Sequence, residues 1–297
     1  MNNLAKNKKR KEGLEATIIK VIAYIYFAIF SLCVLVPFYI MLKNSLTSKT
    51  ENMASMEFSW IPKMGVTLEA YSTALFSDIL DSYGITIFRG FFNTMWQTLP
   101  TLLISLFVAG LAAFAYAKLK FPGKEVFFTI TLSTMMIPGA VMTMPSYVFY
   151  DSIGWSNTPL PLIIPGLFGG AGTIFFLRQF FRGIPTELLE ASKMDGLGFL
   201  GMYVKIMIPL AKPAFISQFI FGFIGGYNSY MGPLLYLNGQ TELYPLQMAL
   251  TLYQGIYSGE PAVVAAFTIL ALLPMLIIYI FMQKYFVEGI AATGIKG

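Results

Sequence analysis

The sequence lacks histidine altogether and has a single cysteine, Cys33, among its 297 residues. Serine–histidine triads, cysteine–histidine dyads and zinc sites built from these two residue types are therefore excluded. One cysteine cannot form a disulfide within the chain, so the redox compartment is left undetermined. The composition thus points away from the commonest forms of hydrolytic and metal-dependent catalysis.

Charged residues are also scarce, at 12% of the chain, whereas soluble domains carry about 25%. Hydrophobic residues make up 56% and aromatic residues 16%. A surface so poor in charge does not keep a domain of this size dissolved. We therefore predict an all-α membrane protein, in which lipid is the solvent for about half of the chain.

A bilayer core about 30 Å thick is crossed by roughly 20 apolar helical residues. Six segments meet this requirement: 18–42, 93–117, 126–150, 161–177, 206–228 and 263–283. The prediction is a basic tail (1–17), a first span followed by an outer loop (43–92), a five-helix core (93–283) and a C-terminal tail (284–297). The first span lacks a cleavage site at its end, so we interpret it as an uncleaved signal anchor.

The Lys and Arg residues are distributed unequally between the two predicted sides of the membrane. If both termini are cytoplasmic, 16 of the 20 Lys and Arg residues face the cytoplasm, as the positive-inside rule expects. This explains the net charge of +5 without a nucleic-acid partner. The five acidic residues of the outer loop are expected on a solvated cap: Glu51, Glu57, Glu69, Asp78 and Asp81.

The six spans contain no Asp, Glu or His. Ion-coupled carriers commonly place such groups at mid-membrane, so a secondary transporter is disfavoured. The sequence also has no P-loop, because neither Ser nor Thr follows a Gly-Lys pair. A source of energy is therefore expected outside this chain. The pairs Gly166/Gly170 and Gly222/Gly226 are interpreted as small faces for close helix packing.

The connection 178–205 differs from the other short loops because it carries its own helix signals. Ile184-Pro185-Thr186-Glu187 marks a start and Asp195-Gly196 a stop. The prediction is a surface helix of about ten residues. One stripe combines an apolar knob with small residues and suits close approach of a partner: Leu188, Ala191, Ser192 and Asp195.

This loop resembles a known motif. Glu190-Ala191-Ser192, Gly196 and Ile206-Met207-Ile208-Pro209 match the spacing of the EAA loop, EAA-x3-G-x9-I-x-L-P, with Ser for Ala and Ile for Leu. The motif is typical of inner-membrane permeases of binding-protein-dependent ABC importers. Three other segments are similar to the carbohydrate branch of that family, with its MalG-like and LplC/YtcP-like permeases: 116–124, 153–158 and 227–234. The ending 289–297 resembles GxxxGAVKG.

The resemblance implies a type I ABC importer permease fold in the bacterial cytoplasmic membrane. The implied partners are a second homologous permease, two ATPase subunits and an extracellular solute-binding lipoprotein. ATP and magnesium would be held by the ATPases, and this chain would be non-catalytic. Glu190, Ala191, Ser192 and Gly196 would meet an ATPase, with Leu188 as the knob and Asp195 beside them. Gly294 and Lys296 would reach it too, unless the tail is simply frayed.

Solute contacts are expected in the outer half of the membrane, where rings, amides and hydroxyls suit a sugar. The candidates are Tyr147, Tyr227, Asn228, Ser229 and Tyr230. Some tyrosines are equally consistent with an interfacial belt. The outer loop 229–262 contains Asn238-Gly239, a hairpin-like turn signal. The alternative function is an ATP-independent carrier or facilitator of a small polar solute, which leaves the EAA-like loop unexplained.

Overall fold

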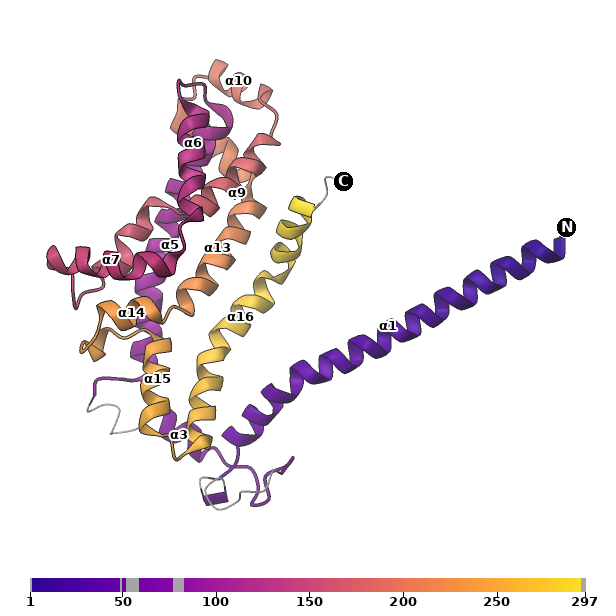
Figure 1. Cartoon of the computed structure of the whole chain (residues 1–297), viewed down its shortest axis with the longest axis vertical. Helices are drawn as coiled ribbons and strands as arrows, with labels where there is room; N and C mark the ends of the chain where they lie inside the picture. The colour runs from indigo at the N-terminus through magenta and orange to yellow at the C-terminus, as the bar shows by residue number, and fades with distance from the viewer. Residues whose placement is uncertain (1, 49, 52–58, 77–82, 295–297) are drawn as a thin grey trace. The chain divides into compact units, whose positions relative to one another are not determined.

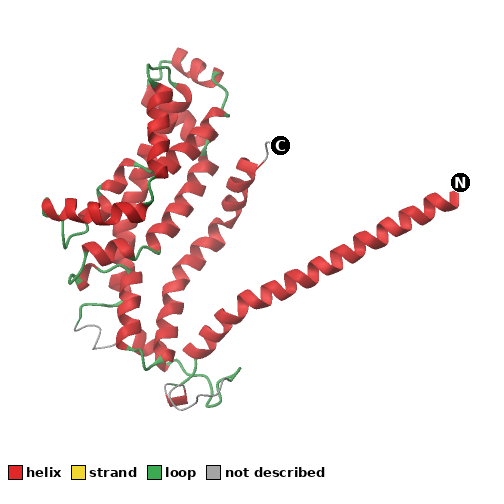
Figure 2. Cartoon of the chain, in the orientation of Figure 1, coloured by secondary structure: helices red, strands yellow, loops and turns green. Residues whose placement is uncertain are grey.

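A computed structural model describes residues 2–48, 50–51, 59–76 and 83–294 of the chain, with side chains from residue 17 to residue 283. Within these ranges the regular elements are helices, and none of the described residues forms a strand (Figure 2). The prediction of an all-α chain is confirmed. Two units divide the chain: residues 1–74 with 257–269, and residues 75–256 with 270–297.

The first unit contains α1 (Asn2–Ser45), most of α3 (Glu69–Leu75) and the first turns of α16 (Pro261–Gly294). Hydrogen bonds tie the segment after α1 back onto the end of that helix. The Ser45 and Tyr71 hydroxyls lie 2.8 Å apart, and the Thr67 amide donates to the Leu46 carbonyl. The segment that contains Thr67 and Tyr71 is thus anchored to the C-terminal end of α1.

Glu51 corrects the prediction of a fully solvated acidic cap. Its side chain is buried, and its carboxylate accepts hydrogen bonds from the backbone amides of Lys63 and Met64, at 2.7 and 2.9 Å. These two bonds hold the pKa of Glu51 below its ordinary value. Glu69 is exposed as expected. Glu57, Asp78 and Asp81 lie outside the described residues.

The second unit is built around α5 (Ile87–Lys118), against which α9 (Ala171–Arg182), α13 (Lys212–Tyr227) and α15 (Leu246–Ile256) pack (Figure 1). The shorter elements complete it. They are α6 (Lys124–Ser133), η1 (Thr134–Met136), α7 (Gly139–Ser152), α8 (Leu160–Ile163), η2 (Pro165–Phe168), α10 (Glu187–Met194), α11 (Phe199–Met202), η3 (Tyr203–Met207), α12 (Ile208–Leu210), α14 (Met231–Tyr236) and η4 (Thr241–Leu243).

Among the described residues, four helical stretches are long and apolar enough to cross a membrane: Thr17–Ser45, Ile87–Lys118, Leu160–Arg182 and Pro261–Gln283. The predicted spans 126–150 and 206–228 are instead bent pairs of helices, by 95° and 82°. Four to six spans are therefore compatible with the structure. The count of six and the cytoplasmic position of both termini stay predictions.

Proline explains where the two pairs bend. Pro138 has extended backbone angles between η1 and α7, and it has no N–H to continue a helix. Pro213 follows Lys212 at the start of α13, directly after the break at Ala211. Freed backbone groups at such breaks are tolerated in membranes where neighbouring protein or water satisfies them.

Of the two glycine pairs predicted to form close-packing faces, the structure supports one and not the other. A Cβ at Gly222 or Gly226 would overlap a side chain of α5, so this pair is a close-packing face as predicted. Gly166 likewise faces α5, but Gly170 has open space around it. Gly169 adopts φ +81° against Ala109 and interrupts the helix, so Gly166 and Gly170 do not share one helical face.

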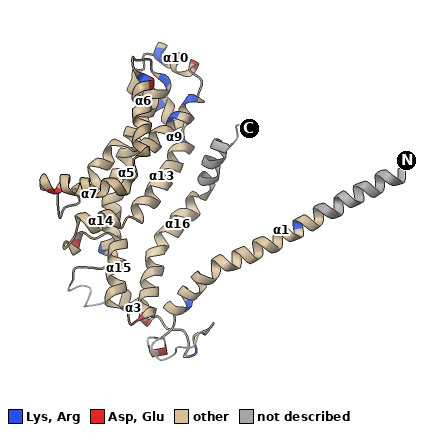
Figure 3. Cartoon of the chain, viewed as in Figure 1, with Lys and Arg blue, Asp and Glu red and all other residues tan. Residues whose placement is uncertain are grey.

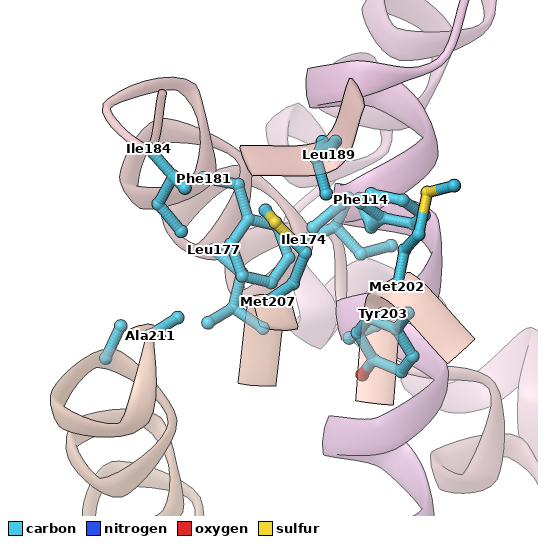
Figure 4. Packing of buried hydrophobic residues seen from close by; sticks show 13 residues of the cluster. Phe114, Ile174, Leu177, Phe181, Ile184, Leu189, Met202, Tyr203, Met207 and Ala211 are labelled. Atoms are coloured by element: carbon cyan, nitrogen blue, oxygen red, sulfur yellow. The ribbon is translucent and has the colours of Figure 1, made fainter. Parts of the chain in front are cut away.

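The hydrophobic core of the second unit lies where α5 and α9 meet the elements around η3 (Figure 4). Leu177, Phe181 and Met207 are completely buried there, together with Tyr203, whose hydroxyl donates to the Phe107 carbonyl at 2.8 Å. Tyr203 fits because Gly110 of α5 has no side chain. A Cβ at Gly110 would overlap the Tyr203 hydroxyl and approach the Phe215 ring to 2.8 Å.

We expect Gly110→Ala to destabilise the protein by about 1–3 kcal/mol, as overpacking of a filled core does. The matched control is Gly225→Ala in α13, where no atom lies within 4 Å of the new methyl group. That control should be neutral or stabilising by up to about 1 kcal/mol, because alanine favours helix. Thermal unfolding of both variants in detergent measures the difference. Equal stability of the two would show that Gly110 is not a packing constraint.

Candidate functional site: the surface helix α10 and its supports

The helix predicted in the 178–205 connection is present as α10, and local chemistry fixes both of its ends. Glu187 and Glu190 lie in the first turn, where the helix dipole favours acidic residues. At the other end Gly196 adopts φ +83°. The Gly196 amide bonds the Lys193 carbonyl and the Leu197 amide bonds the Ser192 carbonyl, which is the hydrogen-bond pattern of a Schellman motif. Only glycine takes such a φ without strain.

The inward face of α10 corrects part of the predicted stripe. Leu189 and Ser192 are buried, and the Ser192 hydroxyl donates to the Leu189 carbonyl at 2.8 Å. Ser192 therefore faces the chain's own core and is not available to a partner. The reason is that Leu189, rather than Leu188, is the apolar residue that packs into the core cluster.

The outward face is open and mixed in character. Leu188 is 44% exposed, Glu190, Ala191 and Asp195 are exposed, and Met194 is 90% exposed. Met194 was not among the predicted contact residues. Its position could have been recognised, because Glu187, Ala191 and Met194 follow helical spacing on the side opposite Leu189. A nearly bare methionine is an adaptable apolar contact for another protein surface.

Lys118 links this helix to the central span. Its ammonium group donates to the Ile184 carbonyl at 2.5 Å and to the Thr186 hydroxyl at 3.4 Å. Both acceptors belong to the segment that leads into α10, whereas Lys118 is the last residue of α5. The start of the surface helix is thus held directly to the end of α5.

Arg178 forms a second support that the sequence analysis did not anticipate. The prediction placed Arg178 at the start of the cytoplasmic loop 178–205, but α9 continues to Arg182 and Arg178 is only 6% exposed. One terminal nitrogen of its guanidinium group donates to both oxygens of Glu125 at 3.1 Å, and its Nε donates to the Tyr116 carbonyl at 3.3 Å. The group also lies 3.7 Å above the Phe128 ring. We call these contacts the Arg178 clasp.

The clasp joins three elements at one end of the unit. Arg178 belongs to α9, Tyr116 to α5, and Glu125 and Phe128 to α6. A buried guanidinium group is tolerated because its charge and several of its donors have partners. The other Lys and Arg residues of the second unit gather mostly at this same end, around α6 and α10 (Figure 3). Loops 118–125 and 178–205 therefore share one end of the unit, as the predicted topology requires.

The predicted solute contacts are not gathered into one site. Tyr227 is 1% exposed and its hydroxyl donates to the Ala271 carbonyl at 2.6 Å, which corrects its assignment to a solute path. Tyr147 stacks on Tyr236, and Tyr230 packs against a small apolar cluster. Asn228 is exposed and accepts a hydrogen bond from Gln247 at 3.0 Å. Of the five, Ser229 lines a cavity beside α5.

The connection 229–262 is helical rather than hairpin-like. Gly239 does make a turn, with φ +84°, but α14, η4 and α15 surround it. This connection is held by a polar stripe of α5. Asn93 donates to the Glu242 and Tyr244 carbonyls, at 2.7 and 3.1 Å, and Gln97 donates to the Leu243 carbonyl at 2.9 Å. The sequence carries a signal for this stripe, because polar residues recur every three or four positions within an apolar span.

The C-terminal contact stays a prediction. Gly294 is the last residue of α16, and no side-chain environment is described there. Lys296 lies outside the described residues.

Comparisons with known proteins agree with this architecture. Residues 86–291 match the model of the family described as "Binding-protein-dependent transport system inner membrane component". The chain is 29% identical over 274 residues to the arabinooligosaccharides transport system permease protein AraQ of Bacillus subtilis, covering 92% of this chain and 94% of that protein. It is 30% identical over 275 residues to a putative ABC transporter permease protein of a Caldicellulosiruptor species, with coverages of 92% and 96%.

A solved structure also shares the fold. It is a bacterial ABC transporter involved in the import of the acidic polysaccharide alginate, with a TM-score of 0.78 and 24% identity over 91% of this chain and 96% of that one. With the family match spanning most of the sequence, the chain belongs to the inner-membrane components of binding-protein-dependent transport systems.

Proposed function

We propose that the chain is the transmembrane permease subunit of an ATP-driven importer. It would translocate an oligosaccharide or another sugar that an extracellular solute-binding protein delivers. The family and the sugar-transport relatives support this function. The observation that carries it is the exposed face of α10, fixed to the spans by buried contacts on its other side.

The proposed mechanism uses α10 as a short rigid lever. Its outward residues, Leu188, Ala191 and Met194, would sit in a cleft of an ATPase subunit, and the acidic residues would flank them. ATP-driven closure of two ATPases would draw together the coupling helices of this chain and of a second permease. Leu189 and Lys118 would then pass the displacement to α5 and rotate the spans between inward-open and outward-open states.

The chemistry of this cycle belongs to the partners in our proposal. ATP and magnesium would bind the ATPase subunits, and this chain would contribute no catalytic residue. The extracellular lipoprotein would select the sugar, and lipid would surround the apolar helix faces. Nucleic acid has no place in the mechanism, because the basic residues near α6 and α10 would face the cytoplasm and mark topology.

Gly196→Val tests the lever. A β-branched residue is strained at φ +83°, so the C-terminal end of α10 should rearrange. In the complete importer we expect sugar uptake to fall at least tenfold, and ATP hydrolysis to lose its stimulation by the binding protein. Gly198→Val is the control, because Gly198 has φ −75° and no atom within 4 Å of an added Cβ. Coupled transport at wild-type rates in Gly196→Val would refute the assignment.

Arg178→Lys tests whether the clasp stiffens the lever. Lysine keeps the charge but loses the guanidinium fork that reaches Glu125 and Tyr116 together. We expect uptake and stimulated ATP hydrolysis to fall severalfold, and stability to fall by roughly 1.5–3 kcal/mol, the range for hydrogen bonds to charged groups. Arg182→Lys, on an exposed residue of the same helix, should change neither. Indistinguishable results for the two variants would remove the clasp from the mechanism.

A further inference from the structure

A polar cavity of about 240 Å³ lies beside α5, within the second unit. One wall is a row of α5 side chains one helical turn apart. Gly222 and Gly226 of α13, with Ser229 just beyond that helix, also line the cavity. The residues that matter here are Gln97, Thr98, Thr101, Ser105, Gly226 and Ser229. Polar side chains inside a membrane span are costly unless they are satisfied or functional.

The hydroxyl groups in this cavity are used unequally. Serine and threonine in a helix often donate to the carbonyl four residues earlier. Thr101 does so toward Gln97, and Ser217 of α13 does so toward Pro213. By contrast, the hydroxyls of Thr98, Ser105 and Ser229 form no hydrogen bond to any described residue, and all three line the cavity.

Glycine keeps the opposite wall free of side chains. A Cβ at Gly226 would overlap the Thr98 methyl group, and a Cβ at Gly166 would come within 2.7 Å of the Thr101 methyl group. Bare backbone therefore lies against the threonine row of α5. Larger residues at these positions would displace the row rather than line the space beside it.

The outer connection orients the amide at one end of the cavity. The side-chain nitrogen of Gln97 donates a hydrogen bond to the Leu243 carbonyl. Its amide oxygen is left as an acceptor on the cavity wall. Thr94, also in the lining, accepts from the Leu246 amide at 2.9 Å and donates to the Gly90 carbonyl. The cavity thus has one fixed amide acceptor and three uncommitted hydroxyls.

We propose that this cavity binds one unit of an uncharged, hydroxyl-rich solute as it crosses the membrane; the inference rests on the proposed function. No charged residue is among those that line it, so an acidic sugar would find no counter-charge. Its volume is below the roughly 300–1,000 Å³ of pockets for drug-sized ligands, which fits one sugar unit rather than a whole oligosaccharide. Thr98, Ser105 and Ser229 are its recognition groups.

The first test removes the free hydroxyls while keeping the cavity shape. In the complete importer, uptake of arabinotriose and lactose should show a KM raised roughly tenfold in the Thr98→Val/Ser105→Ala variant. Ser217→Ala is the matched control, since its hydroxyl already donates to the Pro213 carbonyl and it is not among the residues that line the cavity; its KM should stay within about twofold of wild type. Equal KM values for the double variant, the control and the wild type would overturn the proposal.

The second test needs no transport. In a Cys33→Ser background, Thr98→Cys and Ser105→Cys should react with a charged, water-soluble methanethiosulfonate. Leu103→Cys, on an exposed apolar face of α5 that we expect lipid to cover, should not react. A neutral sugar that the importer takes up should slow the reaction, and digalacturonate should not. Unreactive cavity cysteines, or no protection by a transported neutral sugar, would refute the cavity. Reactive cysteines in an importer that takes up none of the sugars would refute the proposed function instead.

Discussion

Close packing against α5 is the constraint on which the second unit depends. Lipid offers helices no hydrophobic driving force to associate, so contact area between them must come from small residues and close approach. Gly222 and Gly226 bring α13 against α5, and Gly110 admits the Tyr203 ring to the core. The same close approach that stabilises the unit also leaves the hydroxyl row of α5 facing bare backbone.

The surface helix α10 is held rigidly by its contacts with this packed unit. Leu189 enters the core cluster, Lys118 holds the segment before α10, and the Arg178 clasp joins α9 to α5 and α6. A helix of eight residues would not be stable alone in water, because nucleation is costly. Its stability comes from contacts with the spans, and these contacts are what let it transmit force to them.

The sequence predicted the features that depend on local signals. The apolar segments were identified by composition, and α10 by its capping residues Pro185, Thr186 and Gly196. The bends were not predictable from hydropathy, because apolar length is the same for a straight span and a broken one. The first break follows from Pro138, and the second lies at Ala211, directly before Lys212 and Pro213. Loop 229–262 was misjudged because one turn signal cannot distinguish hairpins from helices.

Side-chain direction was the other limit. Leu188 and Leu189 are adjacent, so either could be the leucine that packs inward. The prediction grouped Ser192 with Leu188 on the outward stripe, but Ser192 is buried on the same side as Leu189. Because charged residues were expected to be solvated, the burial of Arg178 and Glu51 was not predicted. Both are buried and hydrogen-bonded to specific partners. The polar row of α5 was overlooked because its neighbours are apolar enough to read as an ordinary span.

In the proposed importer, the outward face of α10 meets an ATPase subunit. The most direct measurement is photo-crosslinking in the complete importer from a benzophenone attached to a single cysteine, in a Cys33→Ser background. Met194→Cys and Leu188→Cys should crosslink to the ATPase, and Met64→Cys, exposed in the first unit, should not. An ATPase that co-purifies but crosslinks from neither α10 position would contradict this contact.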